Sequence, residues 1–350
     1  MEYGMRKLAI LMMASLLSAS SHGALTEGVL MGVNFWGEGF IPKASWNDEL
    51  QQMAKSGVKT IRTSLFPNTV DFIIQASQHG IGSVVIVYPF LGSTAKPKGG
   101  WEKYALLELN PQEFTAAIEP LLDKLEAAGV RLAAFELGNE INAANGDLSD
   151  PGSGRELKLA DLNNANDPEG RAVAAGYRNY VRIVAALKDL RDRSKINQHT
   201  PIISFGWGGK HPGTDVNFHA SIAFWHQEGM DKLVDGYGYH VYPSDDLNRP
   251  IAARIDSLEK GVFSACRLGG KPCWITEWGF GTSESCPAVD ATRAKLVQAM
   301  RSAFQHFAHQ GLLAALIWYD WAISPGKSDT WAIFRCGAIT EAGKLALSPM

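Results

Sequence analysis

The chain has 350 residues, of which 46% are hydrophobic and 20% are charged, and its formal net charge is −3. This composition is typical of a globular protein with a large core and excludes an intrinsically disordered chain. The near-neutral charge gives no basic surplus for binding nucleic acid or an anionic membrane surface. At about 150 residues per domain the length would suggest two domains, although an α/β barrel fills this length as one.

The N-terminus has the organisation of a secretory signal peptide. Arg6 and Lys7 precede an apolar run over residues 8–17, and small residues follow. The run is too short to cross a bilayer, which needs about 20 residues. We therefore expect cleavage of residues 1–24, a mature chain of residues 25–350 in the secreted or periplasmic space, and no membrane association after cleavage. A frayed N-terminal helix is the alternative.

The chain contains four cysteines, an even number that fits disulfide pairing in an oxidising compartment. Three pairings are possible. Cys266 ends a helical pattern and Cys273 begins the next strand, so a Cys266–Cys273 disulfide would staple one tight connection, and Cys286–Cys336 would join two loops. Free buried thiols are the alternative. A zinc site would need a C-x-x-C spacing or a neighbouring pair of histidines, which the sequence lacks.

In chain order, short apolar or β-branched runs alternate with longer amphipathic stretches. The runs predict eight strands, over residues 29–35, 58–64, 82–89, 131–137, 201–207, 236–242, 273–279 and 314–320. Apolar residues at helical spacing, often closed by glycine, predict helices over residues 45–57, 68–80, 110–129, 170–190, 218–234, 250–269, 288–311 and 340–347. This alternation predicts an α/β fold, a single-domain (β/α)8 TIM barrel with a closed parallel sheet.

An open doubly wound sheet is the alternative fold. It would need a glycine-rich phosphate loop after the first strand, and MGVNFWGEGF is no such loop. Residues 142–170 form the one long polar insert, after the fourth strand. Because barrel sites lie at the C-terminal ends of strands, we expect this insert to form a wall of the site. Its Asp and Asn residues lack EF-hand spacing, which favours a solvated loop over a calcium site.

Two glutamates lie at the C-terminal ends of predicted strands. FELGNEIN ends the fourth strand on Asn139 and Glu140, and WITEWG ends the seventh on Glu277. Barrel geometry would place the two carboxyl groups on opposite sides of one mouth. Hydrolysis of a glycosidic bond needs such a pair: one acid protonates the leaving oxygen, and one carboxylate stabilises or attacks the oxocarbenium-like centre.

Side-chain alternation gives the expected direction of both glutamates. In the fourth strand, Glu140 continues an inward row with Leu132, Ala134 and Glu136. Glu136 lies about 13 Å deeper at ~3.3 Å per residue, so we expect it to be the buried partner of an arginine or lysine. In the seventh strand, Glu277 is expected to share an inward row with Cys273 and Ile275.

The order of these motifs resembles clan A of the retaining glycoside hydrolases, which includes many cellulases, mannanases and β-glycosidases. The resemblance implies that Glu140 is the acid/base and Glu277 the nucleophile of a double displacement with net retention and without a cofactor or metal. It implies a β-linked poly- or oligosaccharide as substrate, with Asn139 contacting the sugar 2-hydroxyl.

Further residues in register extend the resemblance over the whole barrel. An arginine at the end of strand two holds the nucleophile in the clan, and Arg62 in TIRTS matches it. His240 and Tyr242 in YHVYP match a His and Tyr two residues apart on strand six, and Trp318 in LIWYDW matches a Trp closing strand eight. The cellulase-type family five would have a His near the end of strand three, where this chain has Tyr88. The family within the clan therefore stays open.

Aromatic residues crowd the strand ends and the loops after them: Trp36, Trp207, Trp278, Trp318, Tyr319, Trp321 and Trp331. Flat rings suit the apolar faces of pyranoses, so we expect sugar contacts from Trp36, Trp207 and Trp278 besides Trp318. Packing of loops over the barrel is the alternative role for these rings. Asn34 and Glu38, just after strand one, are expected to bind hydroxyls in outer subsites.

Three other functions are weighed against glycoside hydrolysis. A non-catalytic carbohydrate-binding barrel would be expected to have lost one carboxylate, and both are present. A metal hydrolase would need clustered ligands such as H-x-H after strand one, where the sequence reads NFW. A transglycosylase on the same scaffold stays open, because an acceptor sugar can replace water. The oligomeric state is not indicated by the sequence.

Overall fold

A computed structural model describes residues 28–36, 41–96, 105–141, 153–209, 214–282, 290–322 and 330–350. The expected signal peptide over residues 1–24 lies outside the described residues. Within these ranges, no helix combines the length and the apolar character needed to span a bilayer.

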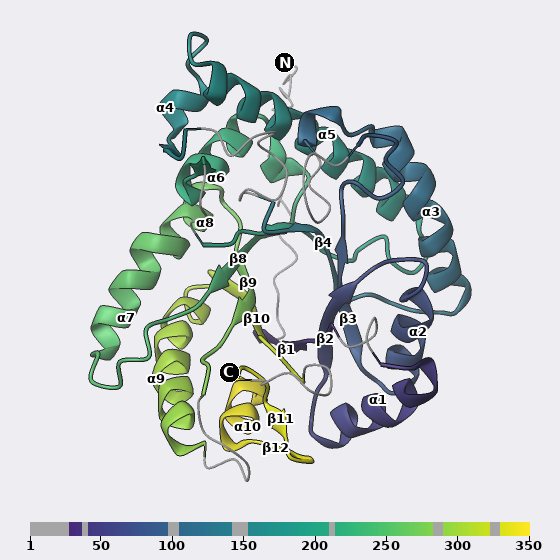
Figure 1. The fold of residues 1–350 in the computed structure, drawn as a ribbon, viewed down its shortest axis with the longest axis vertical. Coiled ribbons are helices and arrows are strands. Elements are labelled where there is room, and N and C mark those ends of the chain that lie inside the picture. Colours follow the sequence, from purple (N-terminus) through teal and green to yellow (C-terminus); the bar gives the residue numbers. More distant parts are fainter. Residues whose placement is uncertain are drawn as a thin grey trace, which may run out of the picture.

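Eight parallel strands form the centre of the molecule, and Figure 1 views them with the helices around them. In sheet order they are β6 (Ile202–Gly206), β4 (Ala134–Asn139), β3 (Gly82–Val87), β2 (Thr60–Ser64), β1 (Leu30–Asn34), β10 (Leu313–Trp318), β9 (Cys273–Trp278) and β8 (Tyr237–Val241). Two parallel bridges, Ile203–Gly236 and Trp207–Tyr239, join β6 to β8 and close the ring. The predicted (β/α)8 barrel and its eight strands are confirmed.

The helices lie outside the strands, as Figure 1 shows. They include α1 (Trp46–Lys55), α2 (Val70–Gln78), α3 (Pro111–Ala127), α5 (Pro168–Arg193), α6 (Phe218–Gln227), α7 (Ile251–Leu258), α8 (Ser264–Leu268), α9 (Ala291–Ala308) and α10 (Glu341–Leu347). Side-chain caps fix several starts: Asn110, Asp167 and Asn217 accept hydrogen bonds from first-turn amides of α3, α5 and α6. The eight predicted helical segments are confirmed, with internal differences in two of them. Residues 218–234, predicted as one helix, form α6 up to Gln227 and then, after Gly229 in the left-handed region, a short 3-10 helix, η4 (Met230–Lys232).

The second difference concerns residues 250–269, also predicted as one helix. There α7 passes into a π-helix, η5 (Glu259–Phe263), before α8 begins. In a π-helix each backbone hydrogen bond spans one residue more than in an α-helix, and such turns are frequent beside functional sites.

The polar insert after β4 contains structure in its described part. β5 (Glu156–Leu157) pairs with β7 (Asp215–Val216), and α4 (Leu159–Leu162) follows. Arg155 bridges Asp161, Asp167 and Glu169 in an exposed charge cluster. The described part of this insert is therefore folded beside α5 and mostly exposed to solvent, and the expectation that it forms a wall of the site stays a prediction.

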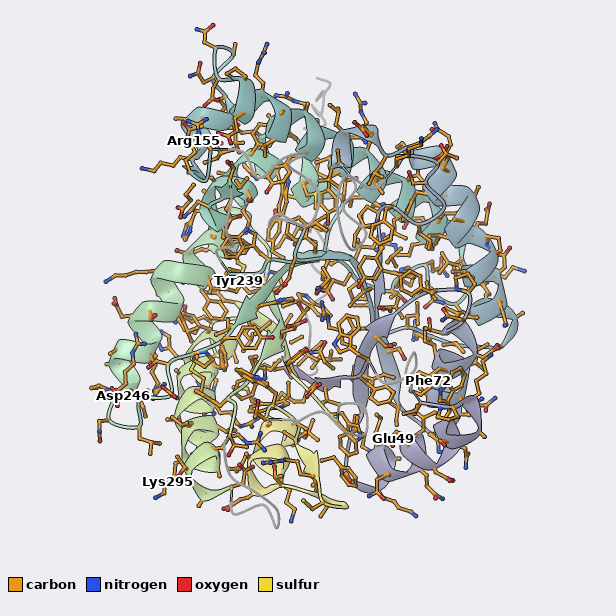
Figure 2. All side chains as sticks on the ribbon, in the orientation of Figure 1. Glu49, Phe72, Arg155, Tyr239, Asp246 and Lys295 are labelled. Carbon is orange, nitrogen blue, oxygen red and sulfur yellow. A yellow bond between two sulfur atoms is a disulfide. The ribbon has the colours of Figure 1, made fainter. Side chains whose placement is uncertain are left out.

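Two apolar clusters lie on the two sides of the sheet. A small one fills the barrel interior and consists of Val84, Ala134, Ile203, Trp274, Ala314, Ala315 and Ile317. The large one lies between strands and helices. In it, Phe72 of α2, labelled in Figure 2, packs against Phe35 and Trp46 at centroid distances of 5.2 and 5.4 Å. The interior cluster forms a floor, and polar side chains lie above it.

The predicted Cys266–Cys273 disulfide is confirmed. It joins α8 to the first residue of β9 with a Cα–Cα distance of 5.7 Å. Cys336 is also disulfide-bonded. Its expected partner, Cys286, lies outside the described residues, so the pairing Cys286–Cys336 stays a prediction.

Candidate active site

Arg62 of β2 lies at the centre of a polar cluster in the barrel. Its side chain is fully buried, and all five N–H donors of the guanidinium are used. Nε and Nη2 bind the Glu136 carboxylate at 2.5 and 3.1 Å. Nη1 binds Glu277 Oε1 at 2.8 Å and Asn34 Oδ1 at 2.7 Å, and Nη2 binds Asn139 Oδ1 at 2.6 Å. The prediction that Glu136 pairs with an arginine is confirmed.

The charges of this cluster depend on one another. Burial alone would lower the pKa of Arg62, but the carboxylates of Glu136 and Glu277 raise it above its ordinary value. Arg62 therefore stays protonated, and it neutralises carboxylates that would be costly to bury alone.

Glu277 is held by a donor on each oxygen. It is 5% exposed. Arg62 binds Oε1, and the hydroxyl of Tyr242 donates to Oε2. Burial and the negative charge of Glu277 raise the pKa of Tyr242, so this phenol keeps its proton and remains a donor. These two buried donors fix the direction of both carboxylate oxygens.

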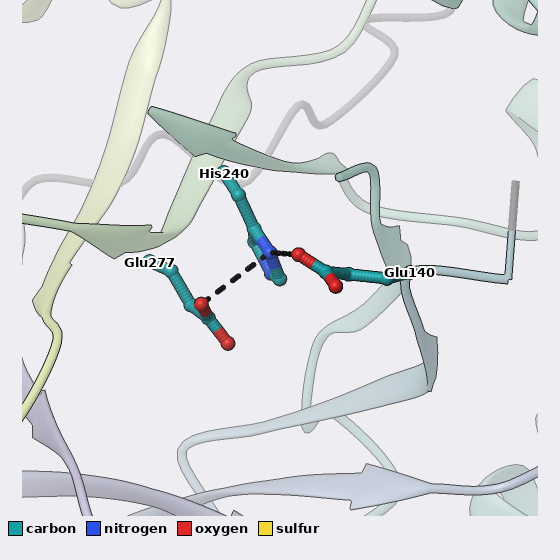
Figure 3. Close-up of side chains that lie close together, drawn as sticks. All are labelled: Glu140, His240 and Glu277. Atoms are coloured by element: carbon teal, nitrogen blue, oxygen red, sulfur yellow. Dashed lines mark hydrogen bonds and ion pairs between the residues drawn. The ribbon is translucent and has the colours of Figure 1, made fainter. Parts of the chain in front are cut away.

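Glu140 faces Glu277 across the ring of His240, as Figure 3 shows. His240 Nδ1 lies 2.8 Å from Glu140 Oε1 and 3.5 Å from Glu277 Oε2. One oxygen of each glutamate and a nitrogen of His240 all lie within 4.8 Å of one another. The structure thus brings together the two glutamates and the histidine that the sequence placed on strands four, six and seven.

Glu277 reaches the mouth through a β-bulge. Between Ile275 and Glu277, β9 contains one residue more than β8, where Tyr239 and His240 are the paired neighbours. The ladder with β10 shifts at the same place. Bulges re-aim side chains in this way. The expected inward row was wrong, because Cys273 and Ile275 belong to the outer apolar cluster while Glu277 points inward.

Gly138 breaks the alternation in β4. Its φ is +98°, a conformation that side chains rarely adopt. Leu137 points to the outer cluster, and Asn139 points inward to Arg62. Glu140 follows with φ +51°, in the left-handed region, and its amide donates to Gly206 O. The predicted inward row is therefore correct for Glu136 but does not continue regularly to Glu140, and Leu132 lies in the outer cluster.

Two glycines at the end of β6, Gly206 and Gly208, make room for the site and were not predicted from the sequence. A Cβ on Gly208 would lie 2.8 Å from the Glu140 carboxyl carbon. A Cβ on Gly206 would lie 2.1 Å from His240 Nε2 and 2.7 Å from Thr276 Oγ1. The G-x-G spacing in FGWGG was the available signal, because alternate glycines on a strand free one face for close approach.

Three of the expected sugar platforms are buried. Trp207 is 8% exposed, and Trp278 and Trp318 are 0% exposed. All three belong to the outer apolar cluster, and Trp278 packs edge-on against Trp318 at 4.9 Å. The expectation of sugar contacts was wrong for these residues, because their side chains point away from the barrel interior.

Other aromatic rings lie at the mouth instead. Tyr319 follows the inward Ile317 by two residues, and its ring centroid lies 6.2 Å from that of Tyr242. The ring of Trp331 lies 5.2 Å from that of Tyr242. A cavity of about 670 Å³ lies beside these rings, lined by Tyr242, Trp331 and Phe280 among others.

Asn34, the last residue of β1, and Trp36 just after it take different positions. Asn34 is fully buried, and its amide donates to Thr276 O and Trp318 O while accepting from Arg62. The expected outer-subsite role was wrong for Asn34, because its polar atoms are used inside the protein. The Arg62 guanidinium lies 5.8 Å from the ring of Trp36, which is partly exposed. Glu38 lies outside the described residues.

The described residues contain one cluster with metal-ligand geometry, which is Glu140, His240 and Glu277. Arg62 and Tyr242 already donate to both oxygens of Glu277. A nearby guanidinium repels a cation and stabilises an anion. The donor set is therefore better matched to proton transfer and nucleophilic attack by carboxylates than to holding an ion.

No protein-family model matches the sequence, and no curated protein matches it. Solved structures do. A family 39 glycoside hydrolase from Bacteroides cellulosilyticus is similar with TM-score 0.53 and 17% identity, over 91% of this chain and 63% of that chain. An endo-1,4-β-mannanase from Rhizomucor miehei is similar with TM-score 0.54 and 13% identity, over 91% and 93%. A hyperthermostable endo-1,4-β-D-mannanase from Thermotoga petrophila is similar with TM-score 0.55 and 11% identity, over 91% of this chain and 98% of that chain.

The chain spans less than two thirds of the family 39 chain but nearly the whole of both mannanases. At such identities the likeness concerns the fold. The chain shares its (β/α)8 barrel with these glycoside hydrolases.

Proposed function

We propose that the protein is a secreted, retaining glycoside hydrolase that cleaves β-glycosidic bonds in a poly- or oligosaccharide. The observation that carries this proposal is the facing pair Glu140 and Glu277, with one oxygen of each within 4.8 Å of the other. Retaining enzymes have their carboxyl groups about 5–5.5 Å apart, whereas inverting enzymes leave about 6.5–9.5 Å for a water. The short separation supports double displacement.

In the first step Glu277 acts as the nucleophile. Arg62 and Tyr242 donate to its two oxygens and fix their direction, so one oxygen can attack the anomeric carbon. Glu140 gives its proton to the glycosidic oxygen as that bond breaks. The products are a glycosyl ester on Glu277 and a free leaving sugar.

In the second step Glu140 acts as the base. It takes a proton from water, which attacks the anomeric carbon and releases Glu277. His240 Nδ1 contacts Glu140 Oε1, so it orients this carboxyl group in both steps. Asn139 has its Oδ1 held by Arg62, which leaves its amide N–H groups for the sugar 2-hydroxyl.

The comparisons support the substrate class. The similar structures are described as glycoside hydrolases, among them mannanases. Disulfide bonding supports an exported protein, since such bonds persist in oxidising compartments. Tyr242, Tyr319 and Trp331 present aromatic faces for pyranose rings at the mouth.

The test is chemical rescue of Glu277→Ala. We expect this variant to lose turnover of aryl β-glycosides, and azide to restore part of it with an inverted glycosyl azide as product. Glu228→Ala, which removes a glutamate paired with Arg178 on the helical surface, is the control and should retain turnover. Substantial activity of Glu277→Ala without azide, and no azide adduct, would show that Glu277 is not the nucleophile.

A further inference from the structure

A second buried arginine lies close to the proposed active site and has no carboxylate partner. Arg254 of α7 is 2% exposed. Its Nη1 donates to Ser244 O at 3.1 Å and its Nη2 donates to Asp246 O. Its Nε is buried without a hydrogen-bond partner. Two of five guanidinium donors are therefore bound to neutral carbonyls, and three remain.

The other buried arginines in the described residues are neutralised. Arg62 is paired with Glu136 and Glu277, and Arg293 is paired with Asp290 through two 2.8 Å hydrogen bonds. Burying a charge without a counter-ion is costly. Arg254 is the exception among these buried arginines, and a bound anion would neutralise its positive charge.

The surroundings of Arg254 add positive charge. Burial and the neighbouring Arg249 lower the pKa of Arg254, and Asp246 opposes them only weakly. Arg249 is half-buried and donates to Ala253 O at 3.2 Å. The Asp246 carboxylate accepts from the amide of Asn248. Figure 2 labels Asp246 near the outer end of α7, on the loop that Arg254 holds.

Both arginines line a cavity that adjoins the catalytic strands. Its volume is about 370 Å³, within the range of small-molecule sites. Its wall also includes Ser244, Ser257 and Tyr242, whose hydroxyl binds Glu277. Gly261 of the π-helix lines the cavity with open space where a Cβ would lie.

We propose that this cavity is a subsite for an anionic sugar unit, whose carboxylate or sulfate binds Arg254 and Arg249. This inference rests on the proposed function. The planar guanidinium matches the two oxygens of such a group, and the serine hydroxyls suit the remaining sugar oxygens. The enzyme would then prefer glycans that carry an acidic unit beside the bond that is cleaved.

The test is binding by isothermal titration calorimetry in a Glu140→Gln background, which prevents turnover. The ligands are oligosaccharides of equal length that are neutral, uronate-containing or sulfated. We expect tighter binding of one or both acidic forms. Arg254→Gln and Arg249→Gln should each reduce that preference about ten-fold or more, as for a lost hydrogen bond to a charged group. Arg178→Gln, an equal charge change on α5, should leave the preference intact.

Folding is checked by thermal unfolding, and Arg249→Gln serves if Arg254→Gln does not fold. Equal binding of neutral and acidic ligands by the parent protein would overturn the subsite, and so would variants that fold and keep the preference. Either result leaves the proposed function standing if the wild type hydrolyses the neutral ligand. Absence of binding and turnover for every ligand would overturn both proposals. Comparing the uronate-containing ligand with the sulfated one shows whether the cavity binds a carboxylate or a sulfate.

Discussion

Arg62 and Arg155 each contact several carboxylates, but in opposite surroundings. Arg62 is fully buried and uses every donor, whereas the side chain of Arg155 is 41% exposed. Buried charges depend on their partners because water cannot replace them, while exposed pairs gain little because water screens them. The number of contacts is similar, yet only the Arg62 cluster is expected to control both folding and chemistry.

The largest expected effect comes from Arg62→Met. It leaves Glu136 and Glu277 buried without a counter-ion, which costs about 3–5 kcal/mol of unfolding free energy. Urea unfolding measures this loss, and Arg155→Met is the exposed control with the smaller effect. Equal midpoints for the two variants would contradict the distinction between the clusters.

A smaller effect is expected from Tyr242→Phe. The residue as a whole is 45% exposed while its hydroxyl binds Glu277, so stability should change little. Removing a hydrogen bond to a charged group should lower kcat about ten-fold or more. Steady-state kinetics with an aryl β-glycoside measure it, and Tyr239→Phe is the matched control. Unchanged kcat would remove Tyr242 from the mechanism.

The same tyrosine gives a pH prediction. Burial and the charge of Glu277 raise the pKa of Tyr242, so its ionisation lies above the ordinary value of about 10. Difference absorbance of tyrosinate between wild type and Tyr242→Phe should therefore show no titration below that pH. A tyrosinate signal that depends on Tyr242 at pH 9 would be inconsistent with its contact to Glu277.

The smallest effect is expected from Glu169 in the Arg155 cluster. Burial would raise its pKa, but hydrogen bonds from Thr214, Ser153 and Arg155 lower it to about 2. The folded pKa is below the unfolded value of 4.5, so this carboxylate contributes stability above pH 4.5 and loses it as the pH falls toward 2. Glu169→Gln should lower the melting temperature at pH 7, and this difference should shrink between pH 5 and pH 3. A difference that grows on acidification would reverse the assigned sign.

Much of the barrel could be predicted, because parallel strands buried on both faces appear as apolar runs. The convergence of Glu140, Glu277, Arg62 and His240 followed from their places at strand ends. The exact directions did not follow, because alternation was extended through the bulge at β9 and through Gly138 as if both strands were regular. Trp278 and Trp318 were expected to contact sugar because aromatic residues crowd the strand ends, but both side chains lie in the outer cluster and face the helices.

The unpaired Arg254 also has no sequence signature. PIAARIDSLEKG gives helical spacing, but nothing in it distinguishes an arginine that is neutralised from one that is not. That distinction depends on which carboxylates the folded loops bring near, and the π-helix that shapes the cavity wall is equally invisible to periodicity.

The reach of Arg62 has one further consequence. From the second barrel strand, its five donors bind side chains of the first, fourth and seventh strands, which are far apart in the sequence. Because Glu277 comes from the seventh strand, Arg62 lacks part of its counter-charge until that strand has been synthesised. Under the proposed function, a chain can begin to act on sugar only when nearly the whole barrel has formed.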